Sequence, residues 1–220
     1  MKITIENLLR ESFLSVLIVS VLLLTAFTYL PHYVWAQTSA EDSVLITLTV
    51  DAGISITSPS DTSMSRSIGV AADTAVASTT WTVRTNNITG YNLTLKATSS
   101  PAMKNNASST VYVSDFSTTT PTTWSVPSAS SSFGFSAYGT DVNTTTWGTG
   151  GDCQASAHTP SATLKYSAFT TSTSSVVATR AYTTPYAGIA TVVCYAVGQN
   201  TYYIPSGTYT ATIVATAVTI

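Results

Sequence analysis

Short runs in which apolar and hydroxyl-bearing side chains alternate fill the sequence beyond residue 40. The clearest run covers residues 91–98, where Tyr91, Leu93, Leu95 and Ala97 occupy every second position. A period of two places such residues on one face of a β-strand and leaves the other face polar. After residue 40 no sustained helical period occurs, and Leu, Glu and Lys, which favour helices, are few. The pattern therefore predicts an all-β fold.

The same pattern predicts further strands at residues 44–50, 54–56, 80–85, 110–113, 123–126, 133–138, 163–168, 176–181, 190–197 and 208–220. We expect the strands at 80–85 and 91–98 to form a hairpin, and residues 139–161 to form a long loop. Many short strands separated by Gly, Pro, Asn and Ser turns favour a mostly antiparallel β-sandwich, immunoglobulin-like or jelly-roll-like. The long apolar strands at 44–50 and 208–220 are expected to pair within one sheet, or one of them with a neighbouring molecule.

The N-terminal segment has the pattern of a secretory signal peptide. An almost unbroken apolar run covers residues 13–30 and is preceded by basic residues. Val34 and Ala36 then stand at the two positions that a signal peptidase reads, so we expect cleavage between Ala36 and Gln37. Cleavage after Ala40 is the second option.

An uncleaved membrane anchor through residues 8–30 is the alternative to a signal peptide, because the apolar run approaches the roughly 20 residues that span a bilayer. In both cases the rest of the chain lies outside the cytoplasm. We therefore expect a signal peptide or anchor at residues 1–36, a short linker at 37–43 and a single β-sandwich domain at 44–220. The expected localisation is extracellular or at the cell surface.

The only two cysteines, Cys153 and Cys194, both lie in the exported part. An even pair in an exported chain predicts one disulfide, with two free thiols as the alternative. Closing a loop of this length contributes about 4 kcal/mol in the chain-entropy model. A tetrahedral metal site is not expected, because His158 is the only histidine of the exported part.

Charged residues make up only 8% of the chain, about a third of the residues are Ser or Thr, and the net charge is -2. This balance provides no basic surface for nucleic acid. The acidic residues are scattered over expected turns, so we expect no catalytic residues, no cofactor and no enzyme activity. Asp141-Val142-Asn143 is similar to part of a calcium loop but lacks its other ligands, which predicts an ordinary turn. A secreted hydrolase is kept as a third hypothesis.

Aromatic residues in expected loops are the candidate contacts for a ligand or partner. Trp147 stands beside the glycine-rich residues 148–151, where an exposed indole could stack on a sugar or anchor a protein. The alternative is that Trp147 folds back over the edge of the sandwich near the disulfide. Tyr202 and Tyr203 are further candidates of the same kind.

Several motifs resemble those of known surface proteins. Residues 46–57, the Trp-Thr-Val motif at 81–83 and residues 90–97 resemble secreted bacterial proteins related to the WxL cell-surface domain. Residues 206–213 are similar to the last strand of spore-coat-U-like and fimbrial subunits. The WxL signature has two Trp-x-Leu motifs, whereas this chain has Trp-x-Val at 81–83 and 124–126. The resemblance implies an exported bacterial β-sandwich at the cell surface or in the medium.

These observations together predict a structural or adhesive surface protein without catalytic activity. Its edge strands, at residues 44–50 and 208–220, are expected to pair between subunits and form a homo-oligomer. A surface polymer or another protein is the other partner that we expect. A secreted carbohydrate-binding module that uses the loop aromatics is the alternative function.

Overall fold

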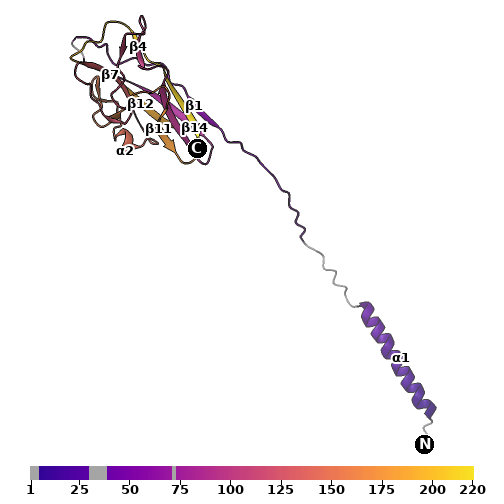
Figure 1. Ribbon diagram of the computed structural model, residues 1–220. Coiled ribbons are helices and arrows are strands. Elements are labelled where there is room, and N and C mark those ends of the chain that lie inside the picture. Colours follow the sequence, from indigo (N-terminus) through magenta and orange to yellow (C-terminus); the bar gives the residue numbers. More distant parts are fainter. Residues whose placement is uncertain (1–4, 30–38, 71–72) are drawn as a thin grey trace. The chain divides into compact units, whose positions relative to one another are not determined.

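The computed structural model describes residues 5–29, 39–70 and 73–220 (Figure 1). Helix α1 (Ile5–Tyr29) precedes a compact unit, Val50–Ile220, which contains every strand that the structure describes. The strands are antiparallel in all their sheets, so the predicted all-β, sandwich-like fold is confirmed. None of the described helices is both long enough and apolar enough to cross a membrane. The expected cleavage site between Ala36 and Gln37 lies outside the described residues.

The first sheet has four strands in the order β1 (Ile54–Thr57), β2 (Thr74–Thr85), β12 (Ile189–Asn200) and β7 (Ser130–Gly139). Strand β12 is central, because it pairs with β2 on one side and with β7 on the other over nearly its whole length. Strand β1 is much shorter than β2 and covers only residues 82–85 of it.

The second sheet has three main strands, in the order β11 (Ser175–Arg180), β3 (Tyr91–Ala97) and β14 (Ile213–Thr219). A short continuation has the order β5 (Tyr112–Val113), β4 (Met103–Asn105) and β13 (Tyr209–Thr210). Strand β13 pairs with β4 just as β14 pairs with β3. The last part of the chain therefore runs along one border of the second sheet, and β1 approaches β14 there (Figure 1).

The predicted hairpin between residues 80–85 and 91–98 is wrong. Strand β2 belongs to the first sheet and β3 to the second, so the short loop between them is an arch that crosses the core. Gly90, at φ +82°, permits this arch, because a side chain there would collide with the backbone carbonyl of Arg180. Alternation in the sequence shows which side chains face inward, but it does not show which sheet a strand joins.

The main core lies between the two sheets. Tyr91, Leu93 and Leu95 of β3 are at most 1% exposed, as the alternation predicts, and Ala97 is also buried. They pack in one cluster with inward-facing residues of the first sheet, among them Phe135. Each sheet thus contributes one apolar face, which is the usual basis of a two-layer β fold.

A second core covers the outer face of the first sheet. An outer layer, formed by residues 116–124 and 153–168, places Phe116, Leu164 and Tyr166 against this face. The half-buried Trp124 stacks on Phe116 at 5.2 Å between ring centroids. Burial raises the pKa of Tyr166 to about 12, so its hydroxyl stays neutral at physiological pH. Strands β7 and β12 are therefore buried on both faces.

Residues 139–161, expected as one long loop, contain three short elements: α2 (Thr144–Trp147), β8 (Gln154–Ser156) and β9 (Thr159–Pro160). The side chain of Asn143 accepts hydrogen bonds from two backbone N–H groups in the first turn of α2. This is the N-cap arrangement that Asn favours. A single helical turn is too short to produce a periodic pattern, so the sequence analysis missed it. Two further short strands of the outer layer, β6 (Thr122–Thr123) and β10 (Lys165–Tyr166), pair with each other.

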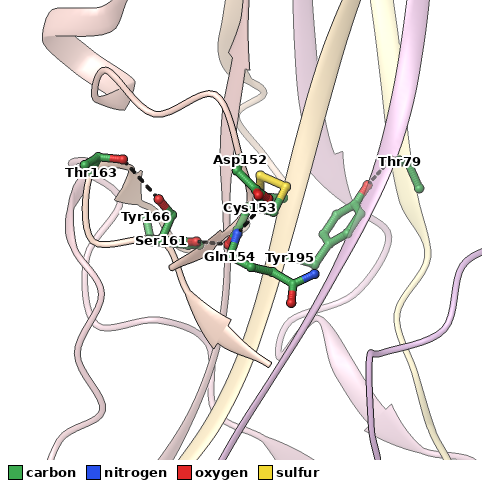
Figure 2. Close-up of a disulfide and its surroundings, with 9 residues drawn as sticks. Thr79, Asp152, Cys153, Gln154, Ser161, Thr163, Tyr166 and Tyr195 are labelled. Carbon is green, nitrogen blue, oxygen red and sulfur yellow. Dashed lines mark hydrogen bonds between the residues drawn. A yellow bond between two sulfur atoms is a disulfide. The ribbon is translucent and has the colours of Figure 1, made fainter. Parts of the chain in front are cut away.

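The predicted disulfide between Cys153 and Cys194 is present and joins the outer layer to β12 (Figure 2). Cys194 is fully buried, and the carbonyl oxygen of Cys153 accepts hydrogen bonds from the backbone N–H of Ser161 and the hydroxyl of Tyr166. Tyr195, the next residue of β12, lies on the opposite face and points into the main core. The disulfide thus lies within the second core and attaches the outer layer to β12, the strand that the two cores share.

The expected strand at residues 44–50 does not form in this chain. No strand of the described residues pairs with this segment, and its apolar side chains lie in solvent. A β-strand is stabilised by hydrogen bonds to a neighbouring strand, so a suitable side-chain pattern is not sufficient by itself. Residues 208–220, the expected partner of segment 44–50, contain strand β14, but β14 pairs with β3.

Replacing both cysteines with alanine should lower the free energy of unfolding by about 2–5 kcal/mol, because the unfolded chain then regains the freedom of a loop closed across 41 positions. Denaturant unfolding of the double variant and of the oxidised protein, followed by tryptophan fluorescence, measures this difference. Equal midpoints and slopes would show that the outer layer stays on β12 without the covalent link.

A buried ion pair fixes the second sheet to the turn after β7. The guanidinium of Arg180 lies 3.0 Å from the carboxylate of Asp141, and both side chains are less than 10% exposed. The hydroxyl of Tyr91 donates a hydrogen bond of 2.9 Å to the same carboxylate. Burial, reinforced by this carboxylate, raises the pKa of Tyr91 well above its usual value. The carboxylate of Asp141 therefore connects the turn after β7 to strands β3 and β11.

Asp141→Ala should lower the free energy of unfolding by about 3–5 kcal/mol, because it leaves the Arg180 charge buried without its partner. Asp73→Ala is the matched control: Asp73 forms the surface pair with Arg66 at 3.6 Å and is largely exposed. Its loss should cost about 0–1 kcal/mol. Chemical unfolding of the two variants measures both values, and similar small losses would contradict the structural role of the Asp141 carboxylate.

Candidate functional site

A groove of about 980 Å³ opens between the two sheets, at the border where β2 and the last part of the chain face each other. One wall is the inner face of β2, with Ala77, Thr79 and Trp81, and the opposite wall is residues 204–213. Residues 58–64 and 66–68, between β1 and β2, also line the groove. The floor is the main core itself, formed by Met103, Val113, Phe133, Tyr195 and Val197. A ligand in this groove would therefore contact the interior of the sandwich directly.

The groove exists because the edge of β2 is covered at two places and open between them. Strand β1 covers residues 82–85, and the chain then leaves the sheet at Ser58. It returns at Ser65, whose backbone N–H donates to the carbonyl oxygen of Val76 at 2.7 Å. Along residues 77–81 the described chain provides no neighbouring strand on this side of β2. The detour 58–64 thus leaves a gap of five positions in the border of the first sheet.

The hydrogen-bonding groups in this gap point outward from the sheet. Residues i and i+2 of a strand direct their N–H and C=O groups to the same side. Val76 bonds to Ser65 on the side away from β12, so Ser78 and Thr80 present their backbone groups to that side as well. Both residues are exposed. The gap therefore has the chemistry of an unpaired sheet edge, which accepts another strand.

The opposite wall is also a sheet border. Strands β13 and β14 each have one neighbouring strand in the described structure. The inward-facing residues Ala211, Ile213 and Ala215 are only half-buried, whereas the inward residues of β3 are fully buried. Of these residues, Ala211 and Ile213 line the groove.

Few charged groups line the groove. Asp61 and Arg66 are its only ionic residues, and both belong to the detour or its return point. The hydroxyl groups of Tyr195 and Thr79 are hydrogen-bonded at 2.8 Å, and Figure 2 shows Tyr195 directed at Thr79. Burial raises the pKa of Tyr195, although the hydrogen bond with Thr79 acts in the opposite direction. Such walls suit an apolar or hydroxyl-bearing ligand.

Residues 44–50 are the second unusual feature of the chain. Leu45, Ile46 and Leu48 are between 83% and 91% exposed, and Val44 and Val50 are almost as exposed. Directly after them, the side chain of Asn86 bonds to the backbone of Asp51 and Gly53, at 2.8 and 2.6 Å. The segment is therefore attached at its C-terminal end to the β2–β3 arch.

Trp147, the leading candidate for a ligand contact, is not on the surface. It is 3% exposed, its ring lies 5.2 Å from that of Phe135, and its indole N–H donates to the carbonyl oxygen of Val176 at 3.3 Å. Helix α2 directs the side chain into the main core. This burial disagrees with an exposed contact role for Trp147 and agrees with the alternative, in which the side chain folds back on the sandwich. It packs in the main core, however, and not beside the disulfide.

The other aromatic candidates are exposed but do not form one site with Trp147. Tyr202 and Tyr203 are 44% and 64% exposed. Tyr202 lines a shallow hollow of about 300 Å³ together with Tyr112. His158 bonds to the hydroxyl of Ser65 at 2.9 Å. In the part of the chain that the structure describes, no group of three or more His, Cys, Asp or Glu side chains is placed to hold a metal ion.

Comparisons with protein-family models, with curated proteins and with solved structures found no match to this chain. The structure itself defines the class: an all-β, sandwich-like protein with one disulfide and an open groove at a sheet border. The resemblance to WxL-related and spore-coat-U-like proteins stays a prediction.

The groove walls have almost no signal in the local sequence. The one candidate is Ala211, a small inward-facing residue near the start of the last strand, and such a residue is compatible with many ordinary strands. The gap along residues 77–81 has no local signal, because it depends on where the detour 58–64 leaves and rejoins β2.

Trp147→Ala should destabilise the protein by about 3–5 kcal/mol, because it removes a large buried side chain and leaves a cavity. Tyr203→Ala, at an exposed position, should stay within about 0.5 kcal/mol of the original protein. Thermal and denaturant unfolding of both variants tests the contrast. Comparable stability of the two variants would place Trp147 outside the core.

Proposed function

We propose that this protein is an exported structural subunit of a cell surface, which assembles by adding the apolar segment 44–50 to a β-sheet of another molecule. The observation that carries the proposal is the exposure of this segment. Val44, Ile46, Leu48 and Val50 occupy every second position and have no strand partner among the described residues. Burying one such side chain contributes about 1.5–3 kcal/mol, so four of them form a strong drive for association.

Segment 44–50 is also suited to strand addition by its composition. It contains β-branched and leucine residues only, with no charge, proline or glycine. Such segments have high β propensity, and an extended segment gains affinity from main-chain hydrogen bonds when it joins a sheet edge. Its alternation supplies one apolar face, and that face determines the register.

Other features support export and a structural role. The buried disulfide fits an oxidising compartment, and the first 36 residues have the signal-peptide pattern. The groove has an apolar floor and few ionic groups, which suits binding of a chain segment better than acid–base chemistry. Because Trp147 is buried, the carbohydrate-binding alternative depends on the exposed residues Tyr202 and Tyr203.

Two matched double variants test the proposal in the mature chain, residues 37–220, which retains all strands, both cores and the disulfide. Ile46→Asp with Leu48→Asp places two charges on the face that we expect to be buried, and it should abolish concentration-dependent assembly. Leu45→Asp with Thr47→Asp places the same charges on the other face, and this variant should still assemble.

Analytical ultracentrifugation and electron microscopy across a concentration series measure the outcome. Both variants should keep the unfolding temperature of the unchanged chain, because all four positions lie in solvent in the free subunit. A mature chain that stays monomeric at the highest accessible concentration would contradict the proposed function. Equal loss of assembly in the two variants would indicate non-specific apolar association.

A further inference from the structure

We infer that the acceptor for segment 44–50 is the groove of a second copy of this chain, where the segment fills the gap along residues 77–81 of β2. This inference rests on the proposed function and names its binding site. The bound segment would follow β1 of the second copy along the same edge of β2. It would take the place that the detour 58–64 leaves free.

The dimensions of segment and gap agree. Five residues of an extended strand span about 16 Å, and the gap between the β1-covered part of β2 and Val76 is five positions long. Five residues of the seven-residue segment can therefore pair, with the backbone groups of Ser78 and Thr80 as partners. The remaining two residues provide the connection to the donor molecule.

The chemistry of segment and groove also agrees. In the bound strand, three alternate apolar side chains from Val44, Ile46, Leu48 and Val50 would face the same side as Ala77, Thr79 and Trp81. This side is the apolar floor of the groove. The small side chains of Ala77 and Ala211, on opposite walls, leave room for them. The alternate residues, such as Thr47 and Thr49, would face solvent beside the exposed Ser78 and Thr80.

The donor must be a different molecule in the arrangement that the structure describes. Asn86 holds the backbone of Asp51 and Gly53 at the β2–β3 arch, beyond the part of β2 that β1 covers. The gap lies on the other side of that covered part.

A donor segment and an acceptor groove are two different surfaces of the same subunit. Contacts between unlike surfaces are heterologous and do not close after two subunits unless the geometry forms a ring. Each subunit in the assembly donates one strand and accepts one. The inference therefore specifies a head-to-tail order with a free segment at one end and an empty groove at the other.

Variants of the groove test the acceptor separately from the donor. Ala211→Arg places a long charged side chain into the groove, and Thr212→Arg places the same side chain in solvent one residue away. Ser78→Pro is a second acceptor variant, because it removes an N–H group at the open edge without a partner in β12. Ala211→Arg and Ser78→Pro should weaken self-association by about a hundredfold or more, and Thr212→Arg should leave it unchanged. The unfolding temperature and the intact disulfide show whether each variant is folded.

Mixing the blocked forms tests the head-to-tail order. The donor-blocked chain, with Ile46→Asp and Leu48→Asp, keeps its groove, and an acceptor-blocked chain keeps its segment. Each should be monomeric alone, and the mixture should form 1:1 dimers that grow no further in sedimentation velocity experiments.

The outcomes separate this inference from the proposed function. Self-assembly of folded groove variants at the original affinity would overturn the acceptor assignment while the role of segment 44–50 stands. A mixture that stays monomeric would overturn the head-to-tail order and point to pairing between two segments. If the unaltered mature chain does not assemble at all, the proposed function fails, and the acceptor assignment fails with it.

Discussion

Strand β12 is buried on both faces, and the rest of the fold depends on this double burial. Its inward residues, such as Val193, are part of the main core, and its outward residues, such as Cys194 and Ala196, are part of the second core. Strands β2 and β7 pair with it on either side, so the first sheet is built around it. Small residues on the outward face of β12 allow the outer layer to approach closely, and the disulfide holds that layer in place.

This construction explains how a chain with 8% charged residues is organised. Two cores use most of the apolar residues of the unit Val50–Ile220, and Ser and Thr occupy both the wet surface and several buried positions next to the backbone. Among the residues that the structure describes, one ion pair is buried: Asp141–Arg180 connects the turn after β7 to the second sheet. The groove, by contrast, is lined almost entirely by neutral side chains.

The borders of the sandwich are not closed as completely as its centre. The first sheet ends in the short β1, and the second ends in β13 and β14, so the groove lies between two sheet borders. An open sheet edge and an exposed apolar segment in one chain are a combination that soluble monomers usually avoid, because it promotes association. Here the two features occur in one chain, with matching length and matching alternation, and we therefore assign them to each other across two molecules.

The sequence by itself determined the local features of this protein. The alternation at residues 91–97 identified the inward face of β3, because the side-chain period is a property of one short stretch of sequence. The two cysteines identified the disulfide, because an exported chain with only two cysteines has only one possible intramolecular pairing. Only the tertiary structure decided the rest. It separated β2 and β3 into different sheets, turned the Trp147 side chain of α2 into the main core, covered the outer face of β12, and left residues 44–50 without a strand partner in the described structure. These outcomes depend on contacts between residues far apart in the chain, and a local pattern encodes the side of a strand that is apolar but not the surface that will cover it.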